Sequence, residues 1–388
     1  MRIFSLVSLG ILIILGILGI AHYVVYEAII TIASLLFPSS AFLVFFSTAI
    51  VKGIFVFLWL SFAIAIALSM KVNNWLVHLY YRITAIWTGL MMYVFGAVAL
   101  YGVVVALDVA ELGNFHQDSL AKVGLVLVCL ACVSVAYGLY NASVIRTTNV
   151  TIKIDGLPQA WRWMKAVWVS DVHLGHIRGK HFAAKVTAAI AACKPDVVFI
   201  GGDLYDGVKV DMHAIVEPFR ALPKICPTFF IMGNHEEFNP NDPPKYIEAV
   251  KALGITVLED EIVEVEGMQI IGVDHGHTDT TEKFRTVMKN IIFDRNRPSI
   301  LLKHEPRDIH VAADAGVSVQ LSGHTHHGQV FPVNILTNMI FRGFGYGLAT
   351  YKRNNAEPLH VYTSSGVGTW GPPVRIGTKS EIVVINFN

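Results

Sequence analysis

Charged side chains are scarce in this chain of 388 residues. Asp, Glu, Lys and Arg make up 15% of it and leave a net charge of +1, whereas apolar residues make up 54%. So apolar a composition excludes a disordered chain, and the missing basic excess excludes a nucleic-acid partner bound through charge. It also excludes a protein that is soluble throughout its length. The four cysteines have neither disulfide nor zinc spacing and indicate buried small residues.

The scarcity of charge is confined to the first part of the chain. Residues 1–145 hold nine charged side chains, and all the others lie in the rest of the chain together with 13 of the 16 histidines. We therefore predict a transmembrane domain over residues 1–145, a connecting segment over 146–163 and a soluble domain over 164–388.

The first part contains four apolar stretches long enough to cross a bilayer, which needs about 20 apolar residues in a helix. They cover residues 4–25, 44–69, 83–107 and 123–141. A shorter apolar segment, 28–37, is open to three interpretations: it extends the first helix, lies in the membrane interface or re-enters the membrane.

Basic residues outside these stretches predict the orientation of the protein in the membrane. Arg2 precedes the first span, Lys71 and Arg82 lie in the loop after the second, and Arg146 and Lys153 follow the fourth. The opposite loops are mainly acidic. The pattern predicts a multi-pass membrane protein with a cytoplasmic soluble domain, an orientation that a fifth span would invert.

Beyond residue 160, short apolar runs alternate with amphipathic segments, which predicts a layered α/β domain with two packed sheets. Strands are expected at 163–170, 196–200, 228–232, 255–258, 299–303 and 317–321, with a hairpin at 262–273 and a strand-rich end. Helices are expected at 181–193, 211–222, 243–253 and 308–314.

Five of the predicted strands end in side chains of types that bind metals. In chain order these side chains are Asp171 and His173, Asp203, Asn234 with His235 and Glu236, His304, and His324 with His326. Ligands of open α/β sheets bind beyond the carboxyl ends of the strands, so the five loops are expected to meet at one site. Each pattern alone is typical of an ordinary turn, whereas all five in this order indicate a functional site.

The residue types suit a centre of two divalent ions. Two ions about 4 Å apart can hold a phosphoryl group and activate water between them. The carboxylate of Asp203 can bridge two ions, and imidazoles combined with carboxylates and an amide favour manganese, iron or zinc over magnesium or calcium. The pattern assigns no role to the neighbouring His327.

Together these motifs resemble the signature of the calcineurin-like metallophosphoesterase superfamily, D-x-H, GD, GNH-[DE], H and GH-x-H, over roughly residues 164–388. The resemblance implies an αββα sandwich of two mixed sheets and two metal ions, with manganese expected and iron or zinc as alternatives. His235 would act on the substrate, as general acid or by stabilising charge in the transition state. One ion would be held by Asp171, His173, Asp203 and His326, and the other by Asp203, Asn234, His304 and His324.

The segments around the motifs favour one branch of that superfamily. Residues 202–207 lack the arginine of the protein Ser/Thr phosphatases, and Tyr205 lies one residue short of the tyrosine ligand of purple acid phosphatases. Residues 323–329 and 364–375 are similar instead to bacterial membrane-associated phosphodiesterases, which include hydrolases of the pyrophosphate in UDP-diacylglucosamine. His327 departs from that branch, where glycine is usual. The resemblance implies a bacterial cell membrane as the location.

These features predict a membrane-anchored phosphoesterase that cleaves a phosphodiester or pyrophosphate bond by attack of a metal-bridging hydroxide, on a lipid-linked or nucleotide-containing substrate. The apolar segment 330–351 forms either a groove for a lipid or a hairpin that packs on the core. Two alternatives are an inactive membrane scaffold or sensor and a transporter with a regulatory metallophosphoesterase-like domain. The membrane part lacks the interior charges that a transporter needs.

Overall fold

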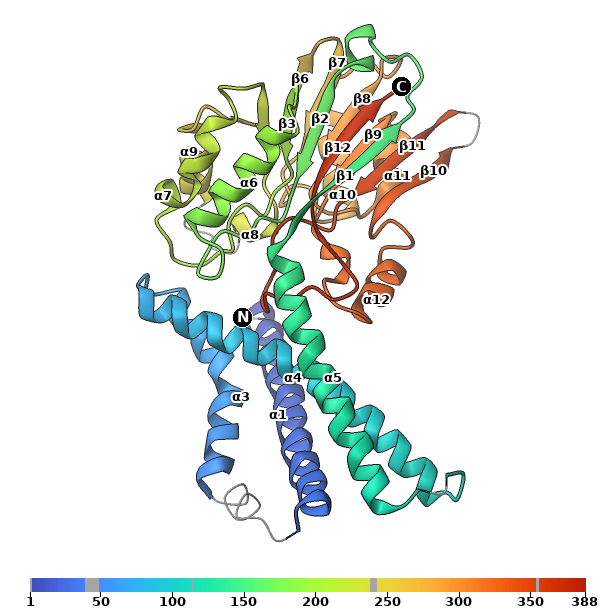
Figure 1. Cartoon of the computed structure of the whole chain (residues 1–388). Coiled ribbons are helices and arrows are strands. Elements are labelled where there is room, and N and C mark those ends of the chain that lie inside the picture. Colours follow the sequence, from blue (N-terminus) through green and yellow to red (C-terminus); the bar gives the residue numbers. More distant parts are fainter. Residues whose placement is uncertain (1, 39–48, 114, 238–242, 354–355) are drawn as a thin grey trace. The chain divides into compact units, whose positions relative to one another are not determined.

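The structure, a computed structural model, describes residues 2–38, 49–113, 115–237, 243–353 and 356–388. Figure 1 shows its helices and strands. The chain separates into two compact units. Residues 1–139 and 371–373 form the first, which we call the membrane unit, and residues 140–370 and 374–388 form the second, the sheet unit.

The described residues of the membrane unit contain four helices that are long and apolar enough to cross a bilayer, so the four predicted spans are confirmed. They are α1 (Arg2–Leu36), α3 (Ala49–Ser69), α4 (Trp75–Val109) and α5 (Gln117–Ser143). Because α1 runs on to Leu36, the apolar segment 28–37 extends the first helix up to that residue. Residues 44–48 of the second predicted span lie outside the described residues.

Close packing and paired polar groups hold α1, α3 and α4 together. A Cβ atom on Gly19 of α1 would lie 2.8 Å from the ring of Trp59 on α3, so glycine permits this close approach. The Trp59 indole donates a hydrogen bond to the Leu15 carbonyl at 2.8 Å, and the Trp87 indole donates one to His22 at 3.0 Å. These polar groups find partners within the bundle, as an apolar surrounding requires.

The sheet unit contains two mixed six-stranded sheets. In the first, the strand order is β1 (Ile145–Ile152), β12 (Ser380–Phe387), β2 (Lys165–Val169), β3 (Val197–Ile200), β4 (Thr228–Phe230) and β5 (Thr256–Val257). In the second, it is β10 (Gly347–Arg353), β11 (Ala356–Thr363), β9 (Val319–Ser322), β8 (Ser299–Leu302), β7 (Met268–Gly272) and β6 (Glu261–Val265).

The two sheets pack against each other, and helices cover their outer faces (Figure 1). The first sheet packs against α6 (Lys180–Ala192), α7 (Met212–Val216), the 3-10 helix Glu217–Ala221 and α9 (Pro243–Lys251). The second packs against α10 (Thr281–Asn290) and α11 (Ile309–Ala315). Short helices fill the connections: Gln159–Arg162, α8 (Asn234–Glu237), His326–Gly328 and α12 (Val333–Ile340). The predicted fold class, membrane helices followed by an αββα sandwich, is confirmed.

The parallel strands determine where the predicted ligands lie. β2, β3 and β4 run parallel in the first sheet, and β7, β8 and β9 run parallel in the second. Both faces of these strands are covered, which explains why their sequences are apolar runs without alternation. Because the carboxyl ends of parallel strands lie at one edge of a sheet, the loops that follow them are brought together.

Three elements differ from the sequence predictions. The connecting segment 146–163 contains most of β1, which pairs in parallel with β12 from Ile145 opposite Ser380 to Ile152 opposite Phe387. Helices α10 and α12 were not predicted. Of the two interpretations of 330–351, the hairpin is wrong, since the helix α12 begins at Val333 and β10 starts only at Gly347.

Candidate metal centre

Backbone hydrogen bonds hold the loops after β2 and β3 together. The Asp171 amide donates to the Gly202 carbonyl, and the His173 amide donates to the Asp203 carbonyl, both at 3.0 Å. Gly202 has a φ of 87°, and a Cβ atom there would lie 2.7 Å from the backbone nitrogen of Gly233. Glycine at this position therefore allows the loop after β4 to approach the loop after β3.

The second sheet supplies the other side of the site. His304 follows β8, and the Gly323 amide after β9 donates to the His304 carbonyl at 2.8 Å. The amide of His324 donates to Asp171 Oδ1 at 2.9 Å. This bond joins the carboxyl edges of the two sheets.

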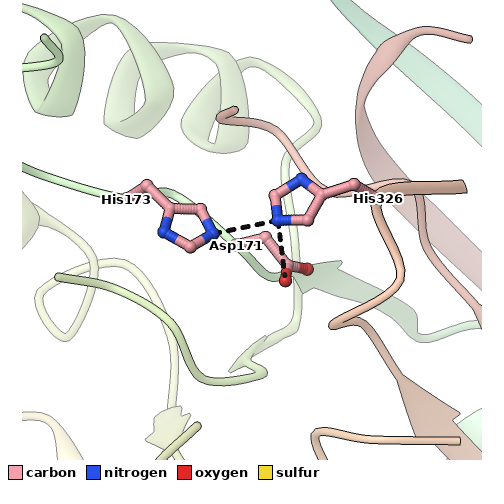
Figure 2. A group of neighbouring side chains, drawn as sticks. All are labelled: Asp171, His173 and His326. Atoms are coloured by element: carbon pink, nitrogen blue, oxygen red, sulfur yellow. Dashed lines mark hydrogen bonds and ion pairs between the residues drawn. The ribbon is translucent and has the colours of Figure 1, made fainter. Parts of the chain in front are cut away.

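Asp171, His173 and His326 form one buried cluster that could hold a metal ion (Figure 2). His173 Nε2 lies 2.9 Å from His326 Nε2, and His326 Nε2 lies 3.6 Å from Asp171 Oδ1. Figure 2 shows the three side chains pointing toward one another from the loops after β2 and β9.

Asp203, His304 and His324 form another cluster that could hold an ion. His304 Nε2 lies 3.2 Å from Asp203 Oδ2. His304 Nδ1 hydrogen-bonds the Gly201 carbonyl at 2.7 Å, which directs Nε2 into the site. Asn234 belongs to the same cluster, because its Oδ1 lies 2.8 Å from His324 Nδ1.

Asp203 also forms a third group that could hold an ion, with His173 and His235, and this group links the other two clusters. Its Oδ2 atom is 3.2 Å from His304 Nε2 and 3.8 Å from His173 Nε2. The structure thus brings all seven predicted ligands together, with the predicted bridging carboxylate at the shared position. Their role in metal binding stays a prediction.

The polar atoms of the site fit a pair of cations. His304 Nε2 is buried with the Asp203 carboxylate 3.2 Å away but without a well-aligned hydrogen bond among the described residues. Burial lowers the pKa of His304, but the carboxylates of Asp203 and Asp171 more than reverse this and raise it to about 10. The position therefore favours a positive charge.

Burial raises the pKa of Asp171, whereas burial lowers the pKa of His173 but its hydrogen bond to Asp206 and the nearby carboxylates more than reverse this and raise it. Three other ligands carry the protonation states that metal binding needs. Burial, aided by the charge of His304, lowers the pKa of His324 to about 3. Burial and the neighbouring His173 hold the pKa of His326 well below its usual value. Both imidazoles are therefore neutral, the form that binds metals. Burial raises the pKa of Asp203, but His304 outweighs it and leaves this pKa well below the ordinary value, so the carboxylate is ionised.

Backbone strain is concentrated at the same residues. A positive φ is rare outside glycine and persists where the surrounding structure enforces it, often at functional sites. Five of the seven predicted ligands have one: Asp171 (55°), His173 (52°), Asp203 (50°), His324 (69°) and His326 (49°).

His235 lies beside the clusters and is almost completely buried. Its amide donates to Asp203 Oδ1 at 2.9 Å, and its ring centre is 4.5 Å from that of His173. Burial lowers the pKa of His235. Asp206, which the motifs did not mark as a site residue, lies 3.8 Å from His235 Nδ1 and 3.2 Å from His173 Nδ1. Its carboxylate can orient both rings.

Glu236 is a second residue whose role the sequence did not reveal. Its buried carboxylate accepts hydrogen bonds from the amides of Asp203, Tyr205 and Gly233, at 2.8 to 3.0 Å. Burial and the charge of Asp203 raise the pKa of Glu236 to about 7. The side chain therefore joins the loops after β3 and β4. The only sign of this role in the sequence was that Glu236 is the acidic residue of the GNH-[DE] motif.

Arg375 is a third such residue. Its fully buried guanidinium donates to the carbonyls of Ser365, Gly366 and Gly368, and Nη2 lies 3.4 Å from His326 Nδ1. Burial and the charge of Arg178 lower the pKa of Arg375 to about 9. The guanidinium therefore holds the loop that backs the first cluster.

Two further histidines lie near the centre. His327 has a φ of 51°, and its ring stacks on Tyr346 with centres 4.0 Å apart. The ring centre of His275 lies 6.0 Å from that of His304. Neither is among the residues of the two clusters.

Residues 164–328 match the family model described as calcineurin-like phosphoesterase. These residues form a calcineurin-like phosphoesterase domain. The match begins just before β2 and ends after the last of the predicted ligands, so it contains both clusters. The clusters suit the paired metal ions typical of such domains.

Proteins similar to this chain come from distant organisms. A Helicobacter pylori protein named an uncharacterized metallophosphoesterase is 30% identical over 58% of this chain and 60% of its own length. A Danio rerio protein named a transmembrane protein with metallophosphoesterase domain is 30% identical over 70% of this chain and 63% of its own length. The chain thus spans about three-fifths of these relatives. A solved Danio rerio dimetal phosphatase is 11% identical over 58% of this chain and 99% of its own, with a TM-score of 0.34.

Proposed function

We propose that this chain is a membrane-anchored phosphohydrolase that cleaves a phosphodiester or pyrophosphate bond with two divalent ions. The observation that carries the proposal is the position of Asp203, whose carboxylate lies within 4 Å of imidazoles from both clusters. A structural histidine cluster would not need so many strained residues around one carboxylate.

The ligands divide into two sets around Asp203. Manganese is the expected metal, with iron or zinc as alternatives, because imidazoles mixed with carboxylates and an amide suit borderline ions. Asp171, His173, Asp203 and His326 would hold one ion, and Asp203, Asn234, His304 and His324 would hold the other.

The bound ions would neutralise phosphoryl oxygens and lower the pKa of water between them. The protein itself supplies the remaining chemistry. His235 lies beside both clusters and acts on the leaving oxygen, as general acid or by stabilising its charge. Asp206 lies on the Nδ1 side of His235, which leaves Nε2 as the ring nitrogen for the substrate.

The proposed substrate is lipid-linked or contains a nucleotide, and the proposed location is a bacterial cell membrane with the sheet unit in the cytoplasm. Four apolar helices and relatives named transmembrane proteins support the membrane location. The distribution of Lys and Arg around the spans supports the orientation.

Hydrolysis by the purified full chain tests the proposal. The chain in nanodiscs is supplied with Mn²⁺, Fe²⁺ or Zn²⁺ and assayed on bis-p-nitrophenyl phosphate, p-nitrophenyl phosphate and a nucleotide-diphosphate lipid, with bound metal measured in parallel. We expect two ions per chain and hydrolysis of the diester or the diphosphate.

The Asp203→Asn variant should lose activity by about 100-fold or more, since even residues that only support a metal ligand contribute 10- to 100-fold. Asp279→Asn, at an exposed ion pair with Lys283, is the matched control and should keep full activity. Two bound ions without hydrolysis of any substrate would favour the scaffold or sensor, and full activity in Asp203→Asn would refute the proposed centre.

A further inference from the structure

Helix α12 presents its apolar side chains to the outside of the sheet unit. Ile335, Leu336, Met339 and Ile340 are each between 54% and 70% exposed. Their spacing of one, three and four residues places them on one side of the helix. Phe331, just before the helix, is also more than half exposed.

The inward side of α12 is polar instead. Thr337 is 8% exposed, and its hydroxyl donates to the Val333 carbonyl at 3.0 Å. Asn334 is half-buried beside it. A surface helix of a soluble domain buries its apolar side and exposes its polar side, so α12 has the reverse orientation.

Contacts at the metal centre hold α12 in this orientation. The hydroxyl of Thr325 donates to the Gly345 carbonyl at 2.7 Å, which ties the chain after α12 to the loop of His324 and His326. The ring centre of Phe341, directly after the helix, is 6.3 Å from that of His324. These contacts prevent α12 from rotating about its axis, so its apolar side stays directed outward.

Trp370 extends the apolar surface to the other side of the centre. Gln329 holds its backbone by two hydrogen bonds, at 2.9 and 3.1 Å, and its ring is 59% exposed. The ring centre lies 6.3 Å from that of His235. The α12 face is defined by Phe331, Ile335, Leu336, Met339, Ile340 and Trp370.

Short contacts within the sheet unit connect this face to a spanning helix. The last turn of α5, residues 140–143, belongs to the sheet unit. Asn141 donates hydrogen bonds to the carbonyls of Arg375 and Thr378, each at 2.9 Å, and the Thr378 hydroxyl donates to the Gln329 carbonyl at 2.6 Å. Gln329 lies four residues before Val333, the first residue of α12.

We propose that the α12 face inserts into the interface of the bilayer that α5 crosses. Amphipathic helices lie in this way with their apolar side among the acyl chains, and tryptophan is enriched at the same depth. The exposed Arg342 at the end of α12 can meet lipid phosphates. We favour a lipid surface over a second copy of this chain as the partner, because only a few consecutive hydrogen bonds connect the α12 face to the last turn of α5.

Insertion would place the metal centre at the level of the lipid head groups. This consequence rests on the proposed function, and it identifies the substrate as the phosphate-bearing head group of an amphiphile in the same leaflet. The insertion itself does not depend on any hydrolysis.

Spin labels on the full chain in nanodiscs of anionic phospholipid test the insertion. In a background without Cys129, Cys132, Cys193 and Cys226, single cysteines replace Met339 or Leu336. A control cysteine replaces Ile292, an apolar residue that is 90% exposed and precedes β8, at the opposite edge of the sheet from the centre. We expect the labels at 339 and 336 to be accessible to oxygen and protected from a water-soluble nickel complex, with the reverse at 292.

Equal nickel accessibility at 339, 336 and 292 would overturn the proposal. So would dipolar broadening between labels of two copies at 339, which would assign the face to a dimer contact. If the background without cysteines does not fold, photoreactive benzoylphenylalanine is placed at position 339 of the native chain instead. We expect it to cross-link to lipid, and cross-linking to protein alone would also overturn the proposal.

A kinetic measurement extends the test to the substrate. Met339→Asp should raise KM for a lipid phosphodiester in nanodiscs by about 10-fold, because a charge opposes insertion, and leave hydrolysis of bis-p-nitrophenyl phosphate unchanged. An inactive protein with inserted labels would contradict only the proposed function. An active protein with nickel-accessible labels would contradict only the insertion.

Discussion

Glu236 shows how much of the centre depends on residues that need not touch a metal. One carboxylate accepts hydrogen bonds from three backbone amides in two loops, and those loops carry Asp203, Asn234 and His235. The precision of the ligands therefore rests on a side chain whose own oxygens are all directed at the backbone.

The variant Glu236→Gln tests this dependence. An amide nitrogen in place of one carboxylate oxygen faces a backbone N–H group, so we expect the free energy of unfolding to fall by about 1–3 kcal/mol. Metal affinity should fall by about 10- to 100-fold, because the loops shift. Metal titration and thermal unfolding measure the two effects. Glu259→Gln, at an exposed ion pair with Lys251, is the control and should change neither.

Arg375 offers a second test at the same scale. Lysine cannot reproduce a planar guanidinium that donates to several carbonyls, so Arg375→Lys should lower the free energy of unfolding by roughly 3 kcal/mol through one or two lost charged hydrogen bonds. It should also weaken metal binding through His326. Arg297→Lys, at an exposed ion pair with Glu264, should cost less than about 1 kcal/mol. Equal losses in the two variants would show that Arg375 has no special role.

At the scale of elements, the sequence predicted best where a strand is buried on both faces. The runs at β2, β3, β8 and β9 are uniformly apolar and end abruptly in polar ligands, so both strand and site could be recognised. β1 could not, because four consecutive polar residues, 146–149, interrupt its apolar pattern at the edge of the sheet. α12 could not be recognised either, because its exposed residues are mostly apolar and such a sequence resembles a buried strand or a hairpin.

The pairing of β1 with β12 predicts where the soluble domain must begin. Without β1 and the following segment, β12 becomes an exposed edge, and the pocket of the fully buried Trp161 loses its occupant. We expect a fragment of residues 144–388 to fold as a soluble monomer and a fragment of residues 164–388 to aggregate. Size-exclusion chromatography and circular dichroism of both fragments check this. A folded, monomeric 164–388 fragment would show that β1 is dispensable.

At the scale of the whole molecule, two units of different physical character share one chain. The membrane unit is held together by close helix packing and paired indoles, whereas part of the stability of the sheet unit would come from bound ions that hold strained, charged loops. Metal should therefore stabilise the two units unequally.

Metal removal tests this difference. An ion that binds only the folded state stabilises it by about 2.7 kcal/mol at a hundred times its Kd. Chelation should thus lower the Tm of the sheet unit, added Mn²⁺ should restore it, and the helical signal of the membrane unit should not change. Scanning calorimetry with circular dichroism follows both. In Asp203→Asn the Tm should not respond to Mn²⁺, and an undiminished response there would show that the ions bind elsewhere.

A single residue, Val144, separates the end of α5 from the start of β1. The connection between the last apolar helix and the first strand of the sheet unit is therefore one residue long. For a phosphate carried by a lipid, encounters would depend on lateral diffusion and on the mole fraction of substrate in the bilayer. Diluting that substrate with inert lipid would then slow turnover, whereas diluting the whole suspension of vesicles would leave the turnover of each enzyme molecule unchanged.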